Sequence, residues 1–339
     1  MEQSIRMRLS NLELLRILSM FFVLIVHADF QVLGIPDQNR LMTNTSYALT
    51  QILFESFAIV AVNVFVLISG WFGIHFKIKS LFNLLFQCAF FLFGIYLFSI
   101  LIGIESFSTL GIKKCLMLTD NVWFVKSYLG LYLLAPVLNA FAETTDKKTF
   151  KIVLLAFFIF QSIYGWYSTG AAYIEKGYSA FSFIGLYLLS RYIRIYQPYF
   201  SRWRAYQDII IYTLLSIATA LLSTITCYFN QIGYFYSLWF YTSPLIIAAA
   251  VFLLLFFSKI PFQSRTVNWI AASCFSVYLF HFILWERYME PLILSFTNDN
   301  FNISALFYIG LSLICFFFLA IFIDKIRIYL WNKFISKIF

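Results

Sequence analysis

The feature that most constrains this chain is a series of long apolar stretches that together occupy most of its 339 residues. Hydrophobic residues make up 62% of the sequence and charged residues 12%, whereas an average soluble domain carries about 25% charged residues. A soluble protein this apolar could not cover its surface with polar groups. The composition excludes an ordinary cytosolic enzyme, a disordered chain and a disulfide-rich secreted scaffold, and it indicates a membrane protein.

A transmembrane helix needs roughly 20 mostly apolar residues. The sequence predicts ten such segments, at about residues 12–33, 47–74, 81–104, 121–141, 152–168, 178–196, 209–229, 234–257, 267–285 and 303–323. Their apolar runs are continuous rather than alternating, which favours helices over the strands of a barrel. We therefore expect an all-α transmembrane bundle of about ten spans. It would form a single integral membrane domain over residues 1–339, with both termini cytoplasmic and no appended soluble domain.

The positive charges fall mainly on one side of the predicted spans. Those on the opposite side are Arg40, Lys113, Lys114, Lys176 and Arg287. Because cytoplasmic loops carry the excess of Lys and Arg, this asymmetry predicts a multi-pass protein of the cell membrane (plasma or inner) with both termini inside. It also accounts for the formal net charge of +9 without nucleic acid as a partner.

Few ionisable or amide side chains occur within the predicted spans, and such residues usually face a cavity, a partner or a pathway. They are Glu13, Arg16, His27, Asp29, Glu55, Asn63, Lys126 and His281. At 1.5 Å per residue, His27, Asn63 and His281 fall in one layer, in the middle to outer half of the membrane. Glu55 and Lys126 fall in this layer or above it. We expect these side chains to form a polar layer inside the bundle.

Arg16 and His27 are eleven residues apart in the first span. This spacing corresponds to about 1100°, or three turns plus 20°, so the two side chains share one face of the helix. They are separated by about 16 Å along its axis. Glu13 precedes Arg16 by three residues, and we expect it to pair with Arg16 and to support the polar layer.

These residues also have structural interpretations. His27 and His281 could be hydrogen-bonding residues that hold membrane helices together. Arg16 and Lys126 could be long side chains that extend to the membrane surface. The five cysteines show neither a C-x-x-C pair nor zinc-ligand spacing, so we expect no metal and no permanently bound cofactor.

Four motifs follow one another through the chain. They are Arg16 and His27 separated by ten residues, Asn63-Val-Phe-x3-Ser69-Gly70, Trp123-Phe-x3-Tyr128-x2-Leu-Tyr-Leu-x2-Pro136, and Ser276-x-Tyr278-x2-His281. In this order the sequence resembles the acyltransferase-3 family of integral membrane O-acyltransferases over nearly its whole length. The resemblance implies transfer of an acyl group, usually acetyl, from cytoplasmic acyl-CoA to a hydroxyl of a surface glycan or its lipid-linked precursor. Acetyl-CoA would be a co-substrate.

The resemblance also assigns residues. The paired Arg and His of the family's first span fall on Arg16 and His27, and its basic pair after the second span falls on Lys77 and Lys79. The family commonly has arginines at that pair, and lysine keeps the charge but loses the bidentate fork. Lys77 and Lys79 could therefore serve only as topology charges. Asn63 stands where many members carry Asp.

We assign further supporting roles by position. Arg191 and Arg194 lie near the predicted inner face, where cationic groups could bind the phosphates of acyl-CoA together with the lysine pair. Ser69 and Gly70 are expected to serve helix packing.

Acyl transfer to a hydroxyl needs a base for the alcohol and a stabilised carbonyl oxygen. His27 is the best candidate base, because an imidazole exchanges a proton near neutral pH, and Arg16 would hold the CoA end of the donor. Direct transfer and an acyl-histidine intermediate both fit this arrangement. Two alternatives to an enzyme are a transporter or flippase of a glycan or small solute, and a non-catalytic membrane scaffold. The protein could also form a homodimer.

Overall fold

The computed structural model describes residues 9–119, 122–167, 173–297 and 302–336, and every regular element in these ranges is a helix. The elements of the first half are α1 (Ser10–Val26), η1 (His27–Leu33), α2 (Gln38–Thr43), α3 (Thr45–Ala58), α4 (Ala61–Phe72), α5 (Ile78–Leu101), α6 (Thr109–Cys115), α7 (Trp123–Thr144) and α8 (Lys147–Tyr167). Those of the second half are η3 (Glu175–Gly177), α9 (Ala180–Tyr196), η4 (Tyr199–Arg202), α10 (Ala205–Tyr228), α11 (Ile232–Leu238), α12 (Pro244–Lys259), α13 (Arg265–Ala271), α14 (Phe275–Leu284), η5 (Trp285–Met289), α15 (Glu290–Ser295), α16 (Ile303–Leu330) and η6 (Trp331–Ile335). The predicted all-α fold is confirmed.

Seven helical segments in the described ranges are long and apolar enough to cross a membrane. They are Ser10–Leu33, Thr45–Phe72, Ile78–Leu101, Trp123–Thr144, Lys147–Tyr167, Ala205–Tyr228 and Ile303–Ile335. An eighth span results if α13–α14 and η5–α15, which are bent by 71° at their junction, are taken together. The helices α9 and α12, also predicted as spans, have 17 and 16 residues. The figure of ten spans stays a prediction.

Three predicted spans are broken. The second is divided into α3 and α4 at residues 59–60, and the ninth is divided into α13 and α14 at residues 272–274. The eighth was expected to be continuous over residues 234–257, but it consists of α11 and α12 with residues 239–243 between them. Pro244 lies in the first turn of α12, where its missing N–H costs nothing and its ring prevents helix on the preceding side. The predicted span ends at Asn121 and Ser168 lie outside the described residues.

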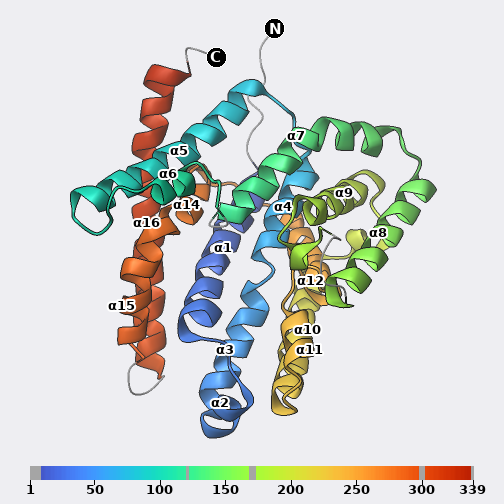
Figure 1. The fold of residues 1–339 in the computed structure, drawn as a ribbon. Coiled ribbons are helices and arrows are strands. Elements are labelled where there is room, and N and C mark those ends of the chain that lie inside the picture. The colour runs from blue at the N-terminus through green and yellow to red at the C-terminus, as the bar shows by residue number, and fades with distance from the viewer. Residues whose placement is uncertain (1–8, 120–121, 168–172, 298–301, 337–339) are drawn as a thin grey trace.

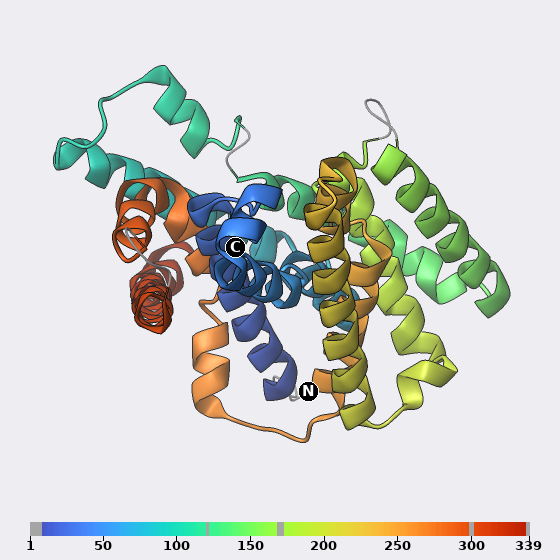
Figure 2. The same cartoon turned by 90° about the horizontal axis from the view of Figure 1, so that it is seen from below.

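The central helices are α1, α3 and α4 (Figure 1). Seen along the bundle, α5, α14 and α16 lie on one side of them and α7 to α10 with α12 on the other (Figure 2). Two clusters of buried apolar side chains correspond to these sides, and α1 contributes Leu12 and Leu15 to one and Met20 and Leu24 to the other. Because α1 belongs to both clusters, its residues lie at the centre of the bundle.

The contact between α4 and α9 depends on a small residue. A Cβ atom on Gly70 would lie 2.4 Å from the carbonyl oxygen of Tyr187 and 2.9 Å from Cβ of Ser190. Ser190 Oγ donates a hydrogen bond to the carbonyl oxygen of Leu67 at 2.6 Å. Ser69, one residue earlier, lies 3.2 Å from the Tyr128 hydroxyl of α7. The Ser69-Gly70 pair therefore lies where α4 packs against its neighbours.

A buried polar network joins α5 to α16. Asp324 and Arg327 form an ion pair with two hydrogen bonds of 2.9 and 3.0 Å, and both residues are buried. Gln87 Nε2 donates to Asp324 Oδ1 at 3.0 Å, and Arg327 Nη1 donates to Asn83 Oδ1 at 2.9 Å. Because each charged group has several partners, this network can be accommodated in the apolar interior.

Candidate active site

His27 lies where the first span changes its helical form. The helix α1 is regular up to Val26, and a π-helical segment, η1, begins at His27. His27 Nδ1 lies 2.8 Å from the carbonyl oxygen of Val23. A carbonyl oxygen only accepts hydrogen bonds, so Nδ1 is the protonated nitrogen and donates. In the neutral imidazole, Nε2 then keeps a lone pair that can accept a proton.

A second imidazole lies against the first. The ring centroids of His27 and His281 are 4.6 Å apart, and Trp285 contacts both rings at centroid distances of 5.9 and 5.7 Å. Tyr278, one turn before His281, lies 5.3 Å from its ring. His281 precedes the π-helical segment η5, so both histidines lie close to a π-helical turn. Such turns often occur at functional sites.

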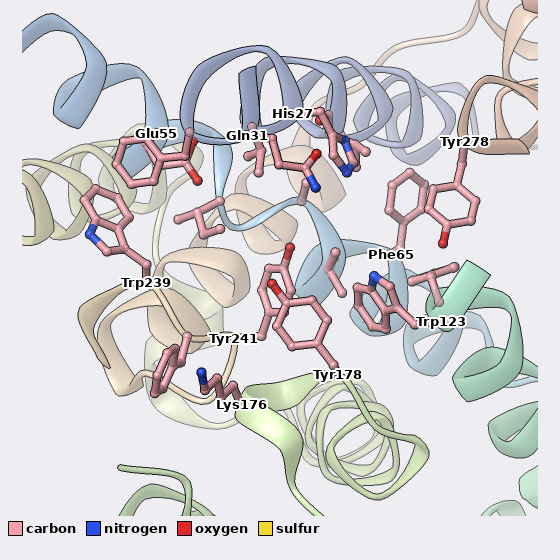
Figure 3. Close-up of a pocket in the computed structure, with 18 of the residues that line it drawn as sticks. His27, Gln31, Glu55, Phe65, Trp123, Lys176, Tyr178, Trp239, Tyr241 and Tyr278 are labelled. Atoms are coloured by element: carbon pink, nitrogen blue, oxygen red, sulfur yellow. The ribbon is translucent and has the colours of Figure 1, made fainter. Parts of the chain in front are cut away.

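His27 lines a cavity of about 470 Å³. Its side chain points into this cavity together with Glu55, Gln31, Tyr178 and Tyr241 (Figure 3). The inner end is lined by buried or half-buried apolar and aromatic side chains, which are Met20, Val23, Phe65, Phe124, Phe275 and Tyr278. At the other end lie the exposed residues Ile35, Lys176 and Tyr236, which belong to the side predicted to face outward. The cavity therefore extends from His27 to the side of the bundle that is predicted to face outward.

Glu55 is the acidic residue of the cavity wall. It belongs to the last turn of α3 and is 2% exposed. Its Oε2 atom has no hydrogen-bond partner within the described part of the chain. A buried carboxylate oxygen without a partner is energetically costly, so this atom is suited to receive a hydrogen bond from a ligand.

Asn63 is buried and holds part of the cavity wall in place. Its Nδ2 atom donates to the carbonyl oxygen of Tyr241 at 3.0 Å. Tyr241 belongs to residues 239–243, the break between α11 and α12. Irregular backbone at membrane depth occurs where protein buries it or where it lines a cavity, and the Asn63 amide supplies one of the hydrogen bonds that it needs.

Arg16 lies nearer the inner end of α1. Its Nη1 donates to both carboxylate oxygens of Glu13, at 3.0 and 3.1 Å, and its guanidinium lies 5.8 Å from the ring of Phe72. Met20, one turn above Arg16, is already part of the cavity wall. The stripe that runs from Arg16 through Met20 and Val23 to His27 therefore leads from the inner part of the bundle to the cavity.

The arginines of α9 gather near the end of α4. Arg194 lies 4.9 Å from the ring of Trp71, and Arg191 Nη2 lies 3.4 Å from Glu143 Oε1. A Cβ atom on Gly73, where φ is +74°, would lie 3.0 Å from Arg191 Nη1. With Arg16 beside the neighbouring Phe72, three guanidinium groups surround the end of α4.

The two lysines after α4 differ in their surroundings. Lys77 is exposed, and its backbone N–H and C=O both bond the Tyr132 hydroxyl at 3.1 Å. Lys79 Nζ instead donates to the carbonyl oxygen of Ser336 at 2.7 Å. The backbone of Lys77 is therefore fixed to α7 through Tyr132, whereas the Lys79 side chain turns to the C-terminal end of the last helix.

Two residues expected in the polar layer lie elsewhere. Lys126 is exposed, and its Nζ donates to the carbonyl oxygen of Thr119 at 2.7 Å. The helix α7 turns Phe124 toward the cavity, and Lys126 follows it by about 200° around the helix, so it points away. Glu13 lies about 21 Å below His27 along α1, where it pairs with Arg16.

Sequence reasoning missed several residues of the cavity. Gln31 follows His27 by one turn, so helical periodicity could have found it. Tyr241 and Trp239 lie in the break before Pro244. The proline was a signal that the helix starts there, but nothing in the sequence indicated which helices would face the break.

The chain was compared with known families, proteins and structures. The model of the acyltransferase-3 family, described as an acyltransferase domain, matches residues 9–324. The comparisons with curated proteins and with solved structures gave no match. The family match covers all four motifs and every helix that lines the cavity. The chain therefore belongs to the acyltransferase-3 family and is a membrane acyltransferase.

Proposed function

We propose that the protein transfers an acetyl group from cytoplasmic acetyl-CoA to a hydroxyl of a surface glycan or of its lipid-linked precursor. The observation that carries the proposal is the tautomer of His27. The Val23 carbonyl holds the proton on Nδ1, so the basic Nε2 is available in a cavity whose far end has exposed residues. That end belongs to the side predicted to face outward. This arrangement suits a base that acts on an acceptor from that side.

The reaction needs one proton transfer and one acyl transfer. His27 Nε2 would take the proton of the acceptor hydroxyl while the oxygen attacks the thioester carbonyl carbon. As the tetrahedral intermediate collapses, the C–S bond breaks and the proton passes to the departing CoA sulfur. The products are an acetyl ester and CoA-SH. In the alternative sequence, Nε2 itself attacks the thioester and forms an acyl-histidine, from which the hydroxyl then receives the acetyl group.

The acetyl-CoA donor would bind near Arg16, at the other end of the face of α1 that carries His27. Arg16, Arg191 and Arg194 surround the end of α4, and guanidinium groups bind phosphates with paired hydrogen bonds. With its phosphates there, the pantetheine arm would run along Met20 and Val23 toward His27. Lys77 would add charge at the same end, and Lys79 would do so only after leaving Ser336.

The test uses the full chain purified into lipid nanodiscs. [14C]acetyl-CoA is mixed with surface polysaccharide that has been stripped of its esters by mild base, and label in the polysaccharide is counted. We expect His27-dependent incorporation and release of CoA-SH. If the wild-type protein incorporates no label but moves unlabelled glycan across vesicles, the transporter alternative is correct and the proposal is wrong.

A further inference from the structure

We infer that Glu55 and the aromatic wall around it form the binding site for the acceptor, and that they recognise a pyranose sugar by one of its hydroxyl groups and by its apolar ring face. This inference rests on the proposed function and deepens it. The reasoning starts from the Glu55 carboxylate, which lies on a different helix from His27 but lines the same cavity.

The carboxylate supplies the hydrogen-bond acceptor. Glu55 Oε2 is buried and has no partner in the described residues, and Figure 3 shows its side chain turned toward the cavity. A sugar hydroxyl would donate to it and remove the cost of the unpaired oxygen. The amide of Gln31, which also points inward, offers both a donor and an acceptor for a neighbouring hydroxyl.

The aromatic residues supply flat apolar surfaces. Tyr178 lies 4.4 Å from Trp123 and 5.0 Å from Tyr241 between ring centroids, so three rings form one wall. Phe30 and Trp239, whose ring centroids are 5.1 Å apart, also line the cavity. The axial C–H groups of a pyranose pack against such ring faces, whose electron density is negative. An entirely apolar ligand would leave the Glu55 oxygen unpaired.

The position of the site fits an acceptor rather than the donor. Exposed lining residues such as Lys176 and Tyr236 lie on the predicted outer side, opposite to the arginine-rich end. Lys176 lies 5.0 Å from the ring of Phe240, so the outer end combines a cation with an aromatic face. A sugar that enters there reaches Glu55 and His27 without crossing the apolar inner wall.

A second buried carboxylate provides a matched control. Asp29 lies in η1 of the first span, whereas Glu55 lies in α3, and Asp29 lines a separate cavity of about 180 Å³ beside α16. Its Oδ1 accepts a hydrogen bond from Gln51 Nε2 at 2.8 Å. Its Oδ2, like Glu55 Oε2, has no partner in the described residues, so Asp29→Asn changes a comparable buried carboxyl group that does not line the larger cavity.

The experiment measures KM for the ester-stripped polysaccharide and for acetyl-CoA separately. For Glu55→Gln, which keeps the shape of the side chain, we expect the acceptor KM to rise at least about tenfold and the acetyl-CoA KM to stay within about twofold. Tyr178→Ala should also raise the acceptor KM, whereas Tyr178→Phe, which keeps the ring, should not. Thermal unfolding of each purified variant shows whether it is folded.

The outcomes separate the inference from the proposed function. If the wild-type protein transfers acetyl groups and Glu55→Gln has an unchanged acceptor KM, the inference is overturned and the proposed function stands. The same holds if Asp29→Asn raises the acceptor KM as much as Glu55→Gln, because the effect would then be long-range charge rather than contact. If the wild-type protein transfers no acetyl group at all, it is the proposed function that fails.

Discussion

The imidazole rings of His27 and His281 lie 4.6 Å apart, although one belongs to the first span and the other to the end of α14. Two neutral rings at this distance cannot both become charged without repulsion. His27 Nδ1 donates a hydrogen bond to the carbonyl oxygen of Val23. His281 Nδ1 has no partner in the described residues. This difference favours His27 as the base of the proposed mechanism, with His281 as a neighbour that can respond to its charge.

Replacement of His27 tests the base directly. We expect His27→Ala to lower the rate of acetyl transfer by roughly 10²–10⁴-fold, the contribution typical of a positioned acid or base. Incorporation of [14C]acetyl into the polysaccharide gives the rate. His75 lies in the exposed loop between α4 and α5, so His75→Ala serves as the control and should keep the wild-type rate. A His27→Ala protein that is folded and fully active would remove the basis of the mechanism.

Replacement of His281 separates a chemical role from packing. His281→Phe keeps an aromatic ring against His27 and Trp285 but removes both nitrogens. If the nitrogens assist His27, kcat should fall by less than the roughly 10²-fold expected for the base itself, with both KM values unchanged. An unchanged kcat with normal thermal stability would mean that His281 only packs against His27.

Replacement of Arg16 tests the donor end. Loss of a hydrogen bond between charged groups costs about 1.5–3 kcal/mol, so we expect Arg16→Ala to raise the KM for acetyl-CoA by about tenfold or more. The acceptor KM should stay the same. Arg287→Ala, on the predicted outer side, is the control. An effect of Arg16→Ala on the acceptor KM alone would contradict the assignment.

The contact at Gly70 predicts a change in stability. In Gly70→Ala the new methyl group would meet the Tyr187 carbonyl and Ser190, and such overpacking costs about 1–3 kcal/mol. Gly94 of α5 has no atom within 4 Å of the position of a Cβ, so Gly94→Ala should be neutral or stabilise by up to about 1 kcal/mol. Thermal unfolding in detergent compares the two. Equal unfolding temperatures would contradict the close packing of α4 against α9.

The ion pair of α16 predicts non-additive effects. Asp324→Leu alone leaves the buried Arg327 guanidinium without its carboxylate, which should cost about 3–5 kcal/mol. The double variant Asp324→Leu/Arg327→Met removes both charges and should recover part of this loss. Unfolding temperatures of both variants and the wild type form the test. A double variant less stable than Asp324→Leu would contradict the expected recovery.

The sequence was sufficient for those parts of the site that depend on one regular helix. Arg16 and His27 share a stripe because α1 is uninterrupted between them, and depth along the spans was enough to place His281 in the layer of His27. The all-α fold and the family follow from apolar length and from the motifs, and both are confirmed. The catalytic and donor-binding roles of these residues stay predictions.

The remaining parts depend on contacts between distant segments. Depth along α7 did not determine the direction of Lys126, because that requires knowing which face of the helix meets the bundle. The π-helical turn at His27 and the break at residues 239–243 have no periodic signal in a short apolar run. Tyr241 therefore reaches the site through tertiary contacts, among them those with Asn63 and Tyr178.

Several segments of the cavity wall depart from regular α-helix, among them η1, residues 59–60 and residues 239–243. Backbone amides at such places have weaker hydrogen bonds than those within α1, so they should open and exchange with deuterium sooner. A sugar that fills the cavity would order these segments together and slow their exchange. Part of the interaction energy between sugar and protein would offset the entropy cost of this ordering. The sugar would therefore bind more weakly than in a rigid pocket, and the modified glycan would be released faster.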